Sequence, residues 1–168
     1  ESGLLRAFAL AQLPAELKLV LTGNPDQALI EISKDLGLAE RLVFTGRVSE
    51  EELAALYRGA VFLIFPSLYE GFGLPIVEAF ASGTPVITSN VTSMPEIAGD
   101  SALLVNPHNI TDMAAAIEQL YGSQELRTQL VERGFKRVTQ FTWDAVAERI
   151  KTAVKAVDTD PAYPLTWS

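Results

Sequence analysis

Short apolar runs alternate with longer amphipathic segments along most of the chain. The apolar runs are bounded by turn residues and are typical of buried strands: LKLVLTG (17–23), LVFTG (42–46), VFLIFPS (61–67), PVITS (85–89) and ALLVN (102–106). The segments between them have apolar residues at helical spacing: LLRAFALAQL (4–13), DQALIEISKDLG (26–37), SEEELAALYRGA (49–60) and PIVEAFASG (75–83). Strands that alternate with helices through short loops predict a parallel, doubly wound α/β sheet.

Local signals mark the ends of several of these elements. Ser49 stands three residues before Glu52, which is the spacing of a capping box. Pro75 is expected at the first position of its helix. The last part of the chain is predicted to be mostly helical, with Thr142 as the N-cap of the final helix. The strand that ends at Phe65 is apolar throughout, which predicts a central strand covered on both faces.

The composition fits one packed domain. The chain has 168 residues, of which 48% are hydrophobic and 20% are charged, as in ordinary folded proteins. A net charge of −8 opposes binding to phosphate backbones, so we expect no nucleic-acid partner. The absence of cysteine removes disulfides and thiolate chemistry and fits a cytoplasmic protein. Neither a signal peptide nor a long apolar span occurs, so no transmembrane segment is expected.

The loop EGFGLP follows the third predicted strand, at an edge where α/β sheets bind ligands. Gly71 and Gly73 allow close approach to a ligand or a positive φ. The start of the next helix offers unpaired amides and a positive dipole end, so a phosphate near Gly73 and Leu74 fits. A tight turn that binds nothing is the alternative. The dinucleotide motif GxGxxG fails because Ile76 occupies the third glycine position, and no P-loop motif occurs.

Two glutamates flank this predicted anion site. Glu78 lies among apolar residues and is expected to be buried, where its carboxylate needs donors. Those donors could be sugar or ribose hydroxyls, or a neighbouring arginine or backbone amide. Glu70 could be a solvated loop acid, or it could bind the same ligand from the other side. A carboxylate, an anion site and a second carboxylate in line would fit a sugar, a pyrophosphate and a ribose, which together make a nucleotide sugar.

The sequence FPSLYEGFGLPIVEAFASGTPVITSN resembles the group 1 (family 4) retaining glycosyltransferases, including their two glutamates separated by seven residues. Similar segments continue in SMPEIAGDSALLVNPHN, RLVFTGRVSEEELAALYRGA (41–60) and FTWDAVAERI (141–150), so the resemblance covers most of the chain. It implies the C-terminal half of a GT-B fold, a Rossmann-like domain that binds the nucleotide-sugar donor. The transfer of a hexosyl group with retention would be metal-independent and would use no cofactor.

The resemblance also implies roles for residues of the loop and helix. Glu70 would be the catalytic residue, contacting the hydroxyls of the donor sugar close to the backbone of Phe72 and Gly73. Leu74 would face the phosphates. Glu78 would hold the ribose hydroxyls.

A second segment is implied to line the base pocket through its backbone: Gly46, Arg47 and Val48. The side chain of Arg47 could equally be a solvated loop cation. Family members typically clamp the pyrophosphate with an Arg and a Lys upstream of the helix that LLRAF begins, and this chain starts too late to include them. We therefore expect residues 1–168 to form a single donor-binding domain, with 159–168 as a tail. The first strand and the acceptor-binding N-terminal domain would be missing, and the isolated domain would be inactive.

Metal chemistry and catalysis by histidine are less favoured. The DTD at Asp158 to Asp160 resembles the DxD of metal-dependent glycosyltransferases, but it is expected to be solvated, and His108 lies in a predicted turn. A nucleotide-sugar epimerase of GT-B architecture and a non-catalytic sugar- or nucleotide-binding module remain alternatives. The acceptor, a sugar or glycolipid, would bind the missing domain, and peripheral membrane attachment through that domain is left open.

Overall fold

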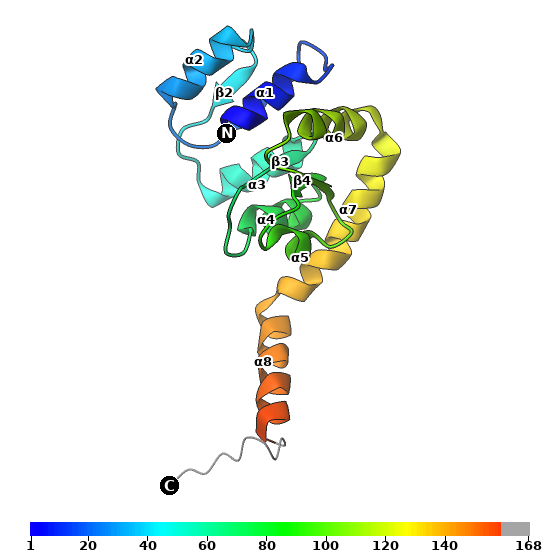
Figure 1. Ribbon diagram of the computed structural model, residues 1–168. Helices are drawn as coiled ribbons and strands as arrows, with labels where there is room; N and C mark the ends of the chain where they lie inside the picture. The colour runs from blue at the N-terminus through cyan, green and yellow to red at the C-terminus, as the bar shows by residue number, and fades with distance from the viewer. Residues whose placement is uncertain (159–168) are drawn as a thin grey trace.

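Short strands alternate with helices through residues 1–158, the part of the chain that the computed structural model describes. This alternation confirms the α/β fold class predicted from the sequence (Figure 1). In chain order the elements are α1 (Ser2–Leu10), β1 (Leu19–Leu21), α2 (Gln27–Asp35), β2 (Leu42–Phe44), α3 (Glu50–Gly59), β3 (Leu63–Phe65), α4 (Leu74–Ala81), β4 (Val86–Ser89), α5 (Met94–Ala98), β5 (Leu103–Val105), α6 (Ile110–Gly122), α7 (Gln124–Val138), the 3₁₀ turn η1 (Thr139–Phe141) and α8 (Trp143–Asp158).

The described strands form two parallel sheets instead of one. β1 pairs with β2, and β3, β4 and β5 pair in that order. β1 and β3 do not pair with each other. A doubly wound sheet is continuous, so the interruption between β1 and β3 departs from the single sheet that was predicted. The expectation that a first strand is missing stays a prediction.

β4, and not β3, is the central strand of the three-stranded sheet. Every residue of β4 is buried, whereas all three residues of β3 are only half-buried. β4 has a partner on each edge, and β3 pairs with β4 alone. The prediction that the run ending at Phe65 is a central strand is therefore wrong for these residues, because an apolar run shows hydrophobicity but not which neighbours will cover it.

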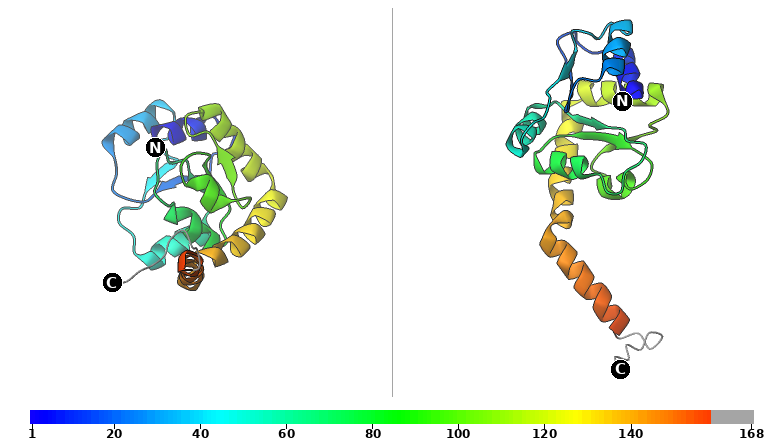
Figure 2. Two further views of the ribbon diagram at one scale, coloured as in Figure 1. Left: turned by 60° about the horizontal axis from the view of Figure 1, so that its bottom comes forward. Right: turned by 90° about the vertical axis from the view of Figure 1, so that its left-hand side faces the viewer.

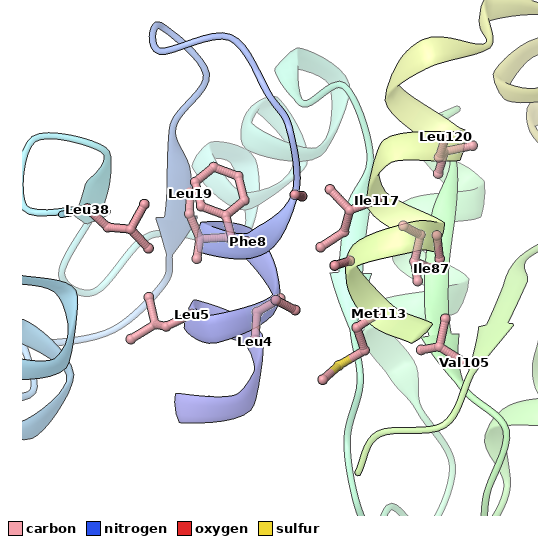
Figure 3. Packing of buried hydrophobic residues seen from close by; sticks show 14 of the residues in the cluster. Leu4, Leu5, Phe8, Leu19, Leu38, Ile87, Val105, Met113, Ile117 and Leu120 are labelled. Carbon is pink, nitrogen blue, oxygen red and sulfur yellow. The ribbon is translucent and has the colours of Figure 1, made fainter. Parts of the chain in front are cut away.

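The larger hydrophobic core lies between α1, α6 and the strands. Leu4 of α1 points toward Met113 and Ile117 of α6, whereas Leu5 points away from α6, toward Leu38 (Figure 3). α1 therefore packs against α6 on one side and against α2 on the other. Each of these buried side chains contributes roughly 1.5–3 kcal/mol to folding. This core holds the helical layer against the sheets.

A smaller core fixes α4. Ile76, Ala79 and Phe80 of α4 pack with Val86 of β4 and with residues of α5. All three α4 residues are exposed by 2% or less. Because packing this close allows little displacement, α4 is held rigidly beside the carboxyl end of β3.

The predicted caps are confirmed. The Oγ of Ser49 accepts from the Glu52 N–H at 3.2 Å, and the Ser49 N–H donates to Glu52 Oε2 at 2.7 Å, which completes the capping box. The Oγ1 of Thr142 accepts from the Ala145 N–H at 3.2 Å. α4 begins one residue earlier than predicted, so Pro75 is its second residue.

The end of the described chain is the long helix α8, which extends away from the body (Figures 1 and 2). Its first residue, Trp143, is 89% exposed. Within residues 1–158, no helix has the length and apolar character needed to cross a membrane.

Candidate functional site

The glycine loop, residues 66–73, leaves the carboxyl end of β3 and enters α4. Parallel sheets of this kind bind ligands outside the carboxyl ends of their strands. The loop therefore occupies the position in the fold that the sequence predicts for a binding site. Hydroxyl groups near the carboxyl end of β4 determine its conformation.

Two hydroxyls of β4 hold the start of the glycine loop. The Oγ1 of Thr88 donates to the carbonyl of Phe65 at 2.8 Å, and the Oγ of Ser89 donates to the carbonyl of Ser67 at 2.7 Å. Both hydroxyl residues are 0% exposed. Neither residue was predicted to contribute to the site, although two polar residues at the end of the apolar run PVITS are a visible signal.

A third hydroxyl holds the end of the loop. The Oγ of Ser93, just before α5, lies 3.0 Å from the carbonyl of Glu70 and 3.1 Å from that of Phe72. One hydroxyl proton shared between two carbonyls draws the loop into a tight curve. This curve leads the backbone into Gly73.

Gly73 provides the backbone conformation that opens α4. It is the N-cap residue, with a φ of 97°, whereas Gly71 does not have a positive φ. An added Cβ at Gly73 would also lie 3.3 Å from Ile76 Cδ1. The N–H groups of Gly73 and Leu74 donate to none of the residues in the described part of the chain. These unpaired N–H groups, one on buried Gly73 and one on exposed Leu74, lie at the positive end of the helix dipole, where anions bind.

Glu70 is half-buried beside this helix start. Its Oε1 accepts from the Oγ of Ser67 at 3.1 Å. A carboxylate can accept about four hydrogen bonds. The geometry therefore leaves Glu70 with capacity for hydroxyl donors from a ligand.

Glu78 is exposed, so the prediction that it is buried is wrong. The reason is the direction of its side chain: Ile76, Ala79 and Phe80 form the inward face of α4, and Glu78 lies outside that face. Its Oε2 accepts from the hydroxyl of Tyr57 in α3 at 3.1 Å. This donor is neither an arginine nor a backbone amide, and no local sequence pattern predicts a contact between residues so far apart.

Burial raises the pKa of the Tyr57 hydroxyl well above its ordinary value, and the charge of Glu78 and the hydrogen bond to it raise the pKa further. Tyr57 therefore stays protonated at neutral and moderately alkaline pH. It is a permanent donor to the Glu78 carboxylate.

Tyr57→Phe is expected to make folding stability less sensitive to alkaline pH. Above about pH 10, where a tyrosine of the unfolded chain loses its proton, folded Tyr57 keeps its proton. The stabilisation from the protonated Tyr57 hydroxyl is therefore fully present below about pH 10. Above about pH 10 the free energy of unfolding falls as the pH rises. Urea denaturation between about pH 8 and about pH 11 measures the fall. If the free energy of unfolding of the variant fell as steeply with pH as that of the wild type, Tyr57 would not be the group responsible for the fall.

Aromatic contacts support the outer side of the glycine loop. The Phe72 ring meets the Phe141 ring edge to face, with centroids 5.8 Å apart. The guanidinium of Arg137 lies 5.4 Å from the Phe141 ring centroid. The same guanidinium donates to the carbonyls of Ile97, at 3.1 Å, and Glu96. Arg137 thus links α7, α5 and the loop.

The predicted base-pocket segment follows β2, whereas the glycine loop follows β3. No hydrogen bond, ion pair or ring contact among the described residues joins the two. The N–H of Gly46 donates to Gly23 O at 3.0 Å, and the N–H of Gly23 donates to Gly46 O at 2.9 Å. The Gly46 backbone is therefore already paired with Gly23, a residue that the sequence analysis missed. Exposed Arg47 and half-buried Val48 are the remaining residues of the segment that a ligand could contact.

The other chemical candidates gain no support. His108 is exposed in the predicted turn. Asp158 ends α8, and the rest of the DTD lies outside the described residues. Residues 1–158 contain no group of three or more His, Cys, Asp or Glu side chains placed to hold a metal ion.

Comparison with known proteins decides the family. Residues 2–137 match the family model described as glycosyl transferases group 1. This chain belongs to that family. As a member of the group 1 glycosyl transferases it is 35% identical over 159 residues to the O-antigen chain mannosyltransferase B of Escherichia coli, covering 91% of this chain and 42% of that protein. It is 37% identical over 136 residues to the MMP alpha-(1->4)-mannosyltransferase of Mycolicibacterium hassiacum, covering 79% of this chain and 33% of that protein.

Solved structures agree with this placement. Sucrose-phosphate synthase from Thermosynechococcus elongatus aligns with a TM-score of 0.78 at 30% identity, over 93% of this chain and 42% of that one. The C-terminal domain of a group 1 glycosyl transferase from Francisella tularensis aligns with a TM-score of 0.73 at 26% identity, over 83% of this chain and 77% of that one. The fold is that of the C-terminal Rossmann-like domain of GT-B glycosyltransferases. The chain spans less than half the length of both mannosyltransferases.

Proposed function

We propose that this chain is the nucleotide-sugar donor-binding domain of a retaining glycosyltransferase that transfers a hexosyl group to an acceptor. One observation carries the proposal: Glu70 and Glu78 flank the start of α4, where the N–H groups of Gly73 and Leu74 donate to no described residue. Hydroxyl, phosphate and hydroxyl groups in line along one ligand would satisfy these three features. A nucleoside diphosphate hexose has that order.

Each residue would bind one part of the donor. The Glu70 carboxylate accepts hydrogen bonds from the hydroxyls of the sugar, close to the backbone of Phe72. The amides of Gly73 and Leu74 bind the diphosphate and stabilise its charge as the bond to the sugar breaks. Glu78 accepts from the ribose hydroxyls. Arg47 and Val48, next to paired Gly46, line the pocket for the base.

The reaction proposed is front-face displacement with retention. The acceptor oxygen attacks the anomeric carbon from the side on which the phosphate leaves, and the departing phosphate assists removal of the acceptor proton. The contribution of the protein is to position the donor and to stabilise the leaving charge. The acceptor, a sugar or glycolipid, would bind another part of the protein. We place the protein in the cytoplasm, with peripheral membrane contact outside this domain left open.

The test is product analysis with labelled donor. GDP-mannose and UDP-glucose are suitable probes, since two of the relatives are named mannosyltransferases and one structural neighbour is described in complex with UDP and glucose. Transfer to an acceptor with retained anomeric configuration supports the proposal. Inverted product, an epimerised sugar, or binding without turnover in the complete protein would each contradict it.

Donor binding is expected to be independent of metal ions. The proposed anion site consists of backbone amides and a helix dipole, which need no bridging cation. Calorimetric titration with a nucleoside diphosphate hexose should give the same affinity with and without a chelator. A loss of affinity on adding the chelator, restored by a divalent cation, would show that a metal takes part.

A further inference from the structure

Each of the two site carboxylates accepts a hydrogen bond from one hydroxyl: Glu70 from Ser67 of its own loop, and Glu78 from Tyr57 of α3. We propose that Ser67 and Tyr57 are positioning residues, which set the orientation of Glu70 and Glu78 before the donor binds. The inference rests on the proposed function, because it assigns the two hydroxyls to the two ends of the same ligand. Ser67 would act on sugar binding, and Tyr57 on ribose binding.

The backbone of Ser67 is held in place. The carbonyl of Ser67 accepts from the buried Oγ of Ser89 at 2.7 Å. From that position the Ser67 Oγ lies 3.1 Å from Glu70 Oε1 and 3.3 Å from the carbonyl of Tyr69. A hydroxyl has one proton to donate, and the bond to a carboxylate is the stronger of the two. Ser67 therefore directs its proton to Glu70.

The backbone of Tyr57 is held in the same way. The carbonyl of Tyr57 accepts from the Oγ1 of Thr84 at 2.7 Å, and Thr84 is 2% exposed. The Tyr57 hydroxyl donates to Glu78 Oε2 at 3.1 Å. Thr84 lies just before β4 and Ser89 is its last residue. Residues at the two ends of β4 thus hold the backbones of Tyr57 and Ser67, whose hydroxyls contact the two carboxylates.

These bonds would increase affinity by ordering the carboxylates in advance. A glutamate on a surface has several rotamers, and binding a ligand through it requires one of them. A hydroxyl on one carboxylate oxygen selects that rotamer and leaves the other oxygen open to the ligand. Removing the hydroxyl should weaken binding by about 3- to 10-fold, which is the effect of ordering one long side chain.

The test is titration of two variants with free nucleoside diphosphate and with the intact nucleoside diphosphate hexose. Tyr57→Phe should weaken both ligands by about 3- to 10-fold. Ser67→Ala should weaken the intact donor to a similar extent and leave the free nucleoside diphosphate unchanged. Tyr121→Phe, the same change in α6, is the matched control and should bind both ligands as the wild type does.

Double variants separate positioning from a structural effect. In a Glu78→Ala background, Tyr57→Phe should have no further effect on affinity, and Ser67→Ala should have none in a Glu70→Ala background. A further loss in either background would overturn the positioning role, as would wild-type affinity in the single variants. If Glu78→Ala and Glu70→Ala themselves bind both ligands normally, the proposed function fails. Thermal unfolding of each variant checks that it is folded.

Discussion

Glu78→Gln is expected to weaken free nucleoside diphosphate and nucleotide sugar alike, whereas Glu70→Gln should weaken the nucleotide sugar alone. The affected affinities should fall by about 5- to 150-fold, or about 1–3 kcal/mol. Each substitution removes charge at a different point along one ligand. A loss therefore appears only for ligands that reach that point. Calorimetric titration of both variants with both ligands measures it.

Because Glu78 is exposed and not buried as predicted, its substitution is expected to affect ligand binding without a large effect on folding. An exposed glutamine can keep an oxygen near the Tyr57 hydroxyl, so folding should change little. Denaturation curves that coincide with the wild type would verify this. Equal loss of free nucleotide binding in both variants would refute the assignment of Glu70 to the sugar and Glu78 to the ribose. Unchanged binding in both would make EGFGLPIVE a structural turn.

Phe80→Ala is expected to lower the free energy of unfolding by about 3–5 kcal/mol. Phe80 is 2% exposed and joins α4 to α7, where it packs so closely on Gly134 that a Cβ there would lie 2.8 Å from its ring. The substitution leaves a cavity at this contact. Because α4 also presents Glu78, donor affinity should fall with stability. Guanidinium denaturation and ligand titration measure the two effects.

Phe135→Ala is the matched control for Phe80→Ala. Phe135 also lies in α7 and has the same side chain, but it is 49% exposed. Because much of its ring stays in water, the same truncation should destabilise the protein by less than half as much. The tip of the Phe135 ring also packs on Gly83, just after α4, so equal effects of the two substitutions would show that the deeper burial of Phe80 is not the source of the stability.

The sequence by itself determined the order and the type of the main elements. Apolar runs and helical spacing gave the strands and helices because these patterns depend on residues close together in the chain. The capping box of Ser49 and Glu52 and the cap at Thr142 were predictable for the same reason. The quoted loop motif also gave the family. The single turn α5 was not predicted, since five residues are too few to show a helical period.

Only the tertiary structure decided how these elements cover one another. The sequence could not show that β4 is central and β3 half-buried, because both runs are apolar and burial depends on neighbouring strands and helices. Nor could it show that the sheet is interrupted between β1 and β3, since strand pairing joins residues far apart in the chain.

The candidate site was also predictable from the sequence only in part. Glu70, Gly73 and Glu78 could be selected from local sequence because they lie within one loop and the helix that follows it. The residues that surround them in space could not be selected in this way. The hydrogen bond from Tyr57 to Glu78 spans 21 positions, and the bond from Ser89 to Ser67 spans 22. A local pattern indicates which face of a helix is apolar, but only the packing of α3 and β4 against α4 and its loop brings the Tyr57 hydroxyl to Glu78 and the Ser89 hydroxyl to the Ser67 carbonyl.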